Sequence, residues 1–214
     1  VDNLVDGSFF NSGQSCCGIE RIYVDEKIFN SFLELFISKT YNYKLGNPLE
    51  QENNLGPVVK LSAAEFIINQ MNKALDKGAK KMIDENKFHF PKEHKNYLVP
   101  QILTNVTHEM DFMTEETFGP CVGIMKVSDE NEAVKLMNDS PYGLTASIWT
   151  NDVEIAEKIG NQVQTGTFFM NRCDYLDPAL SWTGVKETGK GCSLSEIAYE
   201  KLTAPKSFHL RKGQ

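Results

Sequence analysis

The chain has 214 residues, with 22 basic and 29 acidic side chains and a net charge of −7. This charge argues against nucleic acid and against anionic membrane surfaces as partners. Apolar residues make up 41% of the chain, which excludes a disordered protein. No apolar run approaches the roughly 18 residues of a transmembrane helix, so we expect no membrane partner.

The cysteine pattern indicates free thiols. The five cysteines form no Cys-x-x-Cys pair, so neither a disulfide framework nor a zinc site is predicted. Free thiols are typical of a reducing compartment, and we expect a cytoplasmic protein. The chain also begins at Val1 in what reads as the middle of a helix, so it resembles a piece of a longer protein.

The apolar pattern switches repeatedly between helical and strand periodicity. In chain order it predicts a helix ended by Gly13, a strand at 22–24, a helix at 27–40, a helix capped by Ser62 that ends at Gly78, strands near 81–83 and 97–103, a strand at 121–127, a helix capped by Ser128 or Asp129, a strand at 145–150, a helix capped by Asn151, and a strand at 166–171. Strands separated by helices of about 10–15 residues predict an α/β fold. We expect a mostly parallel open sheet with helices on both faces.

The first unusual motif is residues 9–18, FFNSGQSCCG, in which a Gly-Gln turn presents the Cys16 thiol after a helix. At an unperturbed pKa near 8.5, only about 3% of a thiol is ionised at pH 7. A catalytic cysteine therefore needs a base or a positive field. From the chemistry alone, Cys16 is either a nucleophile or a small buried apolar residue.

Two later motifs suit a ligand pocket. In residues 115–120, EETFGP, a carboxylate on Glu116 could bind a ribose hydroxyl while the ring of Phe118 covers a planar group. An ordinary turn before a strand is the alternative. Asn171 ends the strand at 166–171, and Leu176 and Trp182 follow it. This arrangement suits either a small-molecule pocket or core packing.

Taken in order, these motifs resemble the aldehyde dehydrogenase superfamily over nearly the whole chain. Residues 9–18 are similar to its cysteine signature, with Cys16 at the nucleophile position, and 115–120 to its Glu-Glu-x-Phe-Gly-Pro motif. Residues 142–150 resemble the strand that follows that motif. Asn171 stands where the family has a late Asn. Residues 184–191 match the stretch Gly-x-Lys-x-[Ser/Thr]-Gly-x-Gly.

The resemblance implies a mechanism. Cys16 would attack an aldehyde to give a thiohemiacetal, hydride would pass to NAD or NADP, and water would hydrolyse the thioester. The backbone N–H of Cys16 would form half of an oxyanion hole. Glu116 would hold the nicotinamide ribose, and Phe118 would pack by the nicotinamide. The residues implied to line the aldehyde pocket are Phe10, Ser15, Cys17, Asn171, Leu176 and Trp182.

The resemblance also predicts a domain organisation. Residues 1–204 would be the catalytic domain, and 205–214 a tail that resembles an oligomerisation strand near 207–211, so we expect a homo-oligomer. The family's dinucleotide-binding domain, general-base Glu and second oxyanion donor precede the cysteine and have no counterpart in this sequence. A chain carrying that half is therefore an expected partner. Residues 181–184 read Ser-Trp-Thr-Gly instead of the family's Pro-Phe-Gly-Gly, so we expect an altered aldehyde pocket.

Two hypotheses follow from these patterns. In the first, the chain is the catalytic half of an NAD(P)-dependent aldehyde dehydrogenase and is inactive by itself. In the second, it is a non-catalytic chain that keeps the fold and serves in assembly. A reactive Cys16 thiol favours the first hypothesis, and an inert one favours the second.

Overall fold

The computed structural model describes residues 1–90, 93–173 and 175–213. Its α-helices are α1 (Asp2–Phe9), α2 (Phe29–Thr40), α3 (Leu61–Asp76), α4 (Glu130–Asn138), α5 (Val153–Gly160) and α6 (Ile197–Leu202). Three short 3₁₀ helices are η1 (Phe10–Gly13), η2 (Glu85–Lys87) and η3 (Asp111–Met113). The strands are β1 (Arg21–Asp25), β2 (Lys80–Lys81), β3 (Gln101–Thr104), β4 (Cys121–Val127), β5 (Tyr142–Gly143), β6 (Thr145–Ile148), β7 (Thr167–Met170), β8 (Trp182–Thr183), β9 (Val185–Lys186) and β10 (Cys192–Ser193).

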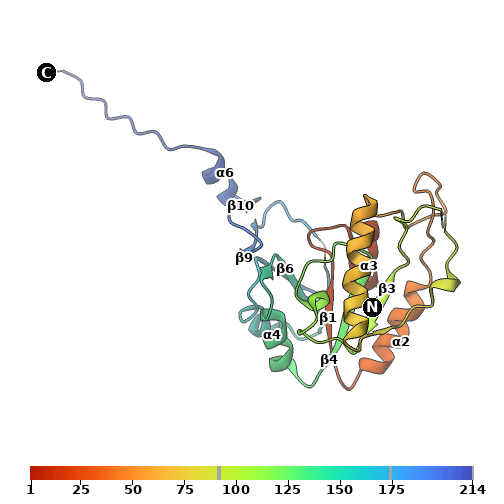
Figure 1. Ribbon diagram of the computed structural model, residues 1–214. Coiled ribbons are helices and arrows are strands. Elements are labelled where there is room, and N and C mark those ends of the chain that lie inside the picture. The colour runs from red at the N-terminus through yellow and green to blue at the C-terminus, as the bar shows by residue number, and fades with distance from the viewer. Residues whose placement is uncertain (91–92, 174, 214) are drawn as a thin grey trace.

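The main sheet has the strand order β1-β4-β3-β2 (Figure 1). β1 and β3 both run parallel to β4, whereas β2 pairs antiparallel with β3. β6 and β7 form a separate parallel pair. β5 with β9 and β8 with β10 form short antiparallel pairs. The predicted α/β fold with a mostly parallel sheet is confirmed.

Two hydrophobic clusters cover opposite faces of the main sheet. Alternate residues such as Ile22 and Ile124 pack with buried residues of α1 and α2, including Phe9 and Phe36. Residues of the other phase, such as Cys121, pack with the apolar side of α3. The two-residue alternation of side chains along each strand produces this division. It places helices on both faces, as expected.

The predicted helix starts were partly wrong. Ser62 does not cap α3, which begins at Leu61 after an extended Lys60 and has no side-chain cap. Ser62 is already helical, and a capping residue needs a non-helical backbone. Asp152, one residue after the predicted Asn151, caps α5 by accepting a hydrogen bond from Ile155 N–H. The predicted cap of α4 by Asp129 is confirmed.

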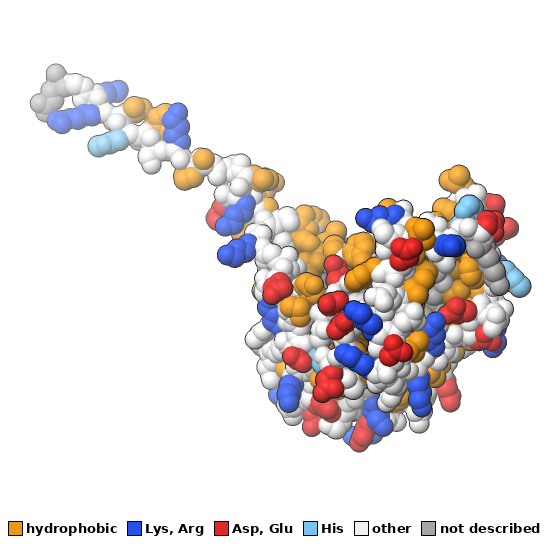
Figure 2. All heavy atoms as spheres, in the orientation of Figure 1, with side chains coloured by type: hydrophobic (Ala, Val, Ile, Leu, Met, Phe, Trp, Pro, Cys, Tyr) orange, Lys and Arg blue, Asp and Glu red, His pale blue; other side chains and the backbone are white. Residues whose placement is uncertain are grey.

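After α6 the chain leaves the body of the molecule as an exposed tail (Figure 1). Within its described part, residues 203–213, the tail has neither helix nor strand, so the expected strand near 207–211 pairs with no described part of the chain. Phe208 and Leu210 are exposed along this segment, and Figure 2 shows apolar side chains both there and on the adjoining body. Oligomerisation through the tail stays a prediction. Among the described residues, no helix has the length and apolarity needed to span a membrane.

Candidate active site

The Cys16 loop leaves α1 through an uncommon backbone conformation. Asn11, Ser12 and Gly13 have φ angles of 50°, 57° and 69°. Three successive residues in the left-handed region turn the chain sharply away from the helix, and only glycine adopts that region without strain. The loop leaves Cys16 exposed, whereas the next residue, Cys17, is buried.

Side-chain hydrogen bonds fix this loop to the segment before α3. Ser12 Oγ donates to the carbonyl of Gly56 at 2.6 Å. Gln14 Oε1 accepts from Val59 N–H at 2.8 Å, while Gln14 Nε2 donates to the carbonyl of Asn11 at 3.0 Å. The Ser and Gln of the motif therefore hold the thiol-bearing loop in place.

Close backbone packing joins the Cys16 loop to the second sequence motif. A Cβ atom placed on Gly13 would lie 2.1 Å from the carbonyl oxygen of Gly119. Such a separation is far inside van der Waals contact, so only glycine fits at this position. The structure thus brings together two motifs that lie about a hundred residues apart in the sequence.

The second motif forms a turn at the start of β4. Phe118 has a φ of 53°, and 41% of the residue is exposed. Glu116 is also exposed. Thr117, which lies between them, is buried and donates its hydroxyl proton to Gln70 Oε1 at 2.7 Å. The alternation points both the carboxylate and the ring of this motif outward from a buried anchor.

Glu20, which the sequence analysis did not single out, holds this turn. Its Oε1 accepts the backbone N–H groups of Thr117 at 3.0 Å and Phe118 at 2.9 Å, and its Oε2 lies 3.1 Å from Thr117 N. Burial raises the pKa of Glu20, and the N–H groups of Phe118 and Thr117 oppose that rise. The sequence signal that could have identified Glu20 is its position, as a carboxylate between the cysteine motif and an apolar strand.

The thiols differ in accessibility. None of the five cysteines, all within the described residues, forms a disulfide. Cys16 is exposed, while Cys121 at the start of β4 is 1% exposed. Burial raises the pKa of Cys121 well above its ordinary value. Because thiolate is the reactive form, burial lowers the reactivity of the Cys121 thiol, whereas the Cys16 thiol remains accessible.

Asn171, the last residue of the predicted strand at 166–171, hydrogen-bonds to the backbone of Thr150. Its φ is 56°, its Oδ1 accepts from Thr150 N–H at 3.0 Å, and its Nδ2 donates to the Thr150 carbonyl at 2.7 Å. These bonds tie the end of β7 to the residues after β6. A pocket-lining role for Asn171 stays a prediction.

The loop after Asn171 borders a small pocket of about 120 Å³. Trp182, one of the predicted pocket residues, lines it together with Phe169. Arg172 also lines the pocket, and its guanidinium lies 3.6 Å from the centre of the Tyr175 ring. Of the other predicted residues, Leu176 and Phe10 are exposed, Ser15 is partly buried and Cys17 is buried.

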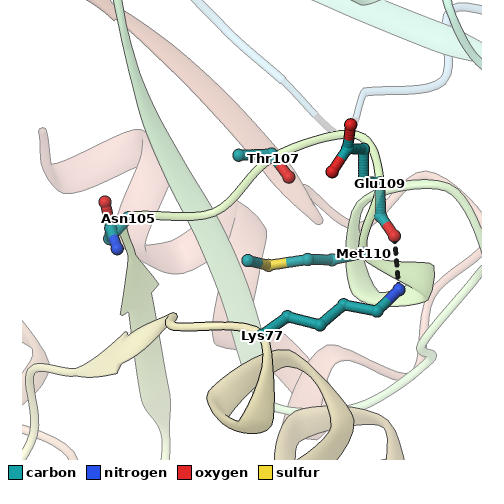
Figure 3. Close-up of a pocket in the computed structure, with 5 residues that line it drawn as sticks. All are labelled: Lys77, Asn105, Thr107, Glu109 and Met110. Carbon is teal, nitrogen blue, oxygen red and sulfur yellow. Dashed lines mark hydrogen bonds between the residues drawn. The ribbon is translucent and has the colours of Figure 1, made fainter.

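A larger pocket of about 380 Å³ lies at the other end of α3 (Figure 3). Its lining residues are Lys77, Asn105, Thr107, Glu109 and Met110, and the Lys77 amine donates to the backbone carbonyl of Glu109. The Cys16 loop is anchored just before α3, whereas Lys77 follows this 16-residue helix. A helix of that length spans about 24 Å, so the pocket is separate from the site around Cys16.

Comparisons with known proteins show the family to which this chain belongs. The model of the aldehyde dehydrogenase family matches residues 1–208. An aldehyde dehydrogenase of Emericella nidulans is 34% identical over the whole chain, which covers 43% of that relative. Succinate semialdehyde dehydrogenase Sad of Escherichia coli, named as NAD(P)+-dependent, is 34% identical over 94% of this chain and 43% of its own length.

A solved structure of Staphylococcus aureus betaine aldehyde dehydrogenase in complex with NAD+ superposes with a TM-score of 0.86 at 28% identity, over 94% of this chain and 40% of that one. The 214 residues thus span about two fifths of the length of these relatives. The family match extends over both motifs that the fold brings together, and the chain therefore belongs to the aldehyde dehydrogenase family.

Proposed function

We propose that this chain provides the catalytic cysteine of an NAD(P)-dependent aldehyde dehydrogenase that oxidises an aldehyde to a carboxylic acid. One observation carries the proposal: an exposed Cys16 thiol lies on a loop anchored by Ser12 and Gln14, whose Gly13 packs directly against the turn bearing Glu116 and Phe118. A nucleophile and a cofactor-binding turn must be adjacent for such a reaction.

The chemistry begins at Cys16. Its thiolate attacks the aldehyde carbon to form a C–S bond, and the carbonyl oxygen becomes the oxyanion of a thiohemiacetal. The backbone N–H of Cys16, which lies on the anchored loop, would donate to that oxyanion. After the carbon loses hydride, water attacks the resulting thioester, which releases the carboxylic acid and restores the thiol.

Glu116 and Phe118 are the residues that would hold the cofactor. An exposed carboxylate and an exposed ring, two residues apart on a fixed turn, suit a ribose hydroxyl and a flat nicotinamide. When bound, NAD or NADP supplies the acceptor for the hydride that the aldehyde carbon loses. Exposure of both groups supports the assignment, because it leaves the carboxylate and the ring accessible to a cofactor.

The remaining roles complete the proposal. Phe10, Ser15, Cys17, Asn171, Leu176 and Trp182 line the aldehyde pocket. Residues 1–204 form the catalytic domain, the tail at 205–214 joins copies in a homo-oligomer, and the protein acts in the cytoplasm. We expect the 214 residues alone to be inactive, because Glu116 and Phe118 would hold only the nicotinamide end of the cofactor. A dinucleotide-binding half is the required partner.

The test is an NAD(P)H absorbance assay with several aldehydes, on this chain alone and together with the dinucleotide-binding half of a relative. Turnover is expected only in the combined sample, and Cys16→Ser should abolish it while Cys192→Ser leaves it unchanged. Steady turnover by the chain alone would contradict the need for a partner. An inert Cys16 with stable oligomers would instead favour the non-catalytic assembly role.

A further inference from the structure

Glu20 is a partly buried carboxylate that the proposed chemistry does not use. It lies four residues after Cys16 and directly before β1. Its main chain is already part of the sheet edge, since the Glu20 carbonyl accepts from Gly123 N–H at 3.0 Å. The backbone of this residue is therefore held by β4, and its side chain extends to the turn that precedes β4.

The side chain of Glu20 satisfies donors that would otherwise lack a partner. The N–H groups of Thr117 and Phe118 both point to Glu20 Oε1, at 3.0 and 2.9 Å. Phe118 has a left-handed φ of 53°, which costs free energy for a residue other than glycine. Hydrogen bonds to a carboxylate are stronger than those between neutral groups, and here they stabilise the strained conformation.

We propose that Glu20 is a positioning residue for the cofactor: it fixes the turn in the conformation that presents Glu116 and Phe118 outward. This inference rests on the proposed function. The Cys16 loop has its own anchors at Gly56 and Val59, so Glu20 acts on the cofactor side of the site and not on the thiol.

Two substitutions separate hydrogen bonding from the mere presence of a side chain. Glu20→Ala removes both acceptors, whereas Glu20→Gln keeps an oxygen that reproduces Oε1, the atom that accepts from both N–H groups. Glu26→Ala is the matched control, because Glu26 is an exposed carboxylate at the other end of β1. The melting temperature of each variant shows whether the chain remains folded.

The first measurement uses the 214-residue chain and does not depend on enzyme activity. Amide hydrogen exchange at Thr117 and Phe118 should be about tenfold faster in Glu20→Ala, and close to wild type in Glu20→Gln and Glu26→Ala. The alkylation rate of Cys16 should stay within about twofold in every variant. Unchanged exchange in Glu20→Ala, or equally fast exchange in Glu20→Gln, would overturn the proposal.

The second measurement uses the combined dehydrogenase assembly. Glu20→Ala should raise the KM for NAD(P) about tenfold with kcat within about threefold, and Glu20→Gln should restore the KM. A fall in kcat with an unchanged KM would contradict a cofactor-positioning role. If the wild-type assembly reduces no NAD(P), the proposed function fails and the cofactor role of Glu20 fails with it, while the exchange data still show whether Glu20 holds the turn.

Discussion

The two sides of the candidate site are built differently. On the cysteine side, Ser12 and Gly13 are buried and contact backbone from two other segments. On the later side, Tyr175 and Leu180 line a small pocket and are 44% and 63% exposed. The contrast indicates that the reacting thiol is held in one geometry, whereas the surface that would select the aldehyde is free to vary.

The largest expected effect concerns the thiols on the rigid side. In native protein, iodoacetamide should modify Cys16 at least about a hundredfold faster than Cys121, because a buried thiol with a raised pKa reacts only after the structure opens. Peptide mapping after timed labelling measures both rates. Cys16→Ser provides the control, and comparable labelling of Cys121 would show that the start of β4, next to the Gly119 turn, opens readily.

The packing of Gly13 gives the next largest effect. Gly13→Ala places a Cβ atom against the Gly119 carbonyl at a left-handed φ, and should destabilise the protein by about 3 kcal/mol. Gly189→Ala is the matched control, since Gly189 has a φ of 121° with no neighbour near its would-be Cβ. It should cost about 1 kcal/mol. Urea unfolding measures both, and equal losses would refute the packing argument.

A smaller effect is expected on the later side. Asn171→Ala loses two hydrogen bonds to Thr150 and leaves alanine at a φ of 56°, for a loss of about 2 kcal/mol. Asn171→Gly loses the same bonds but tolerates the backbone conformation, so its cost should be about 1 kcal/mol. Denaturant unfolding distinguishes them. A larger loss for glycine than for alanine would exclude backbone strain at this position.

The smallest effect is a pH dependence at Glu20. Burial raises the pKa of this carboxyl in the folded state above its ordinary value of 4.5, with Arg21 opposing the rise and Glu116 adding to it. The folded state then binds the proton more tightly than the unfolded state, so stability is lost as the pH rises from 4.5 through the folded pKa. Glu20→Gln should lack this loss. The free energy of unfolding is measured from pH 4 to 8 for the wild type and Glu20→Gln. The same pH dependence in both would contradict this prediction.

The sequence predicted the elements and missed their connections. The β4 strand was expected at 121–127 and is found there, because an apolar run bounded by a Gly-Pro turn and a polar cap is a local signal. The hydrogen bond from Phe118 N–H to Glu20 joins residues about a hundred positions apart, and no local sequence pattern predicts such a contact. The prediction that Asn151 caps α5 was wrong because Asp152, one position later, is an equally good capping residue.

The pairing of β1 with β4 has a consequence for synthesis. Arg21 lies opposite Gly123, so about a hundred residues must leave the ribosome after β1 before its partner exists. At typical elongation rates that takes about 5–20 s. Through this interval the nascent chain carries the Cys16 loop without β4 and without the Gly119 turn against which Gly13 packs. Cys17, which is buried once the chain has folded, is therefore open to oxidation during synthesis, and we expect a reducing environment to matter most at that stage.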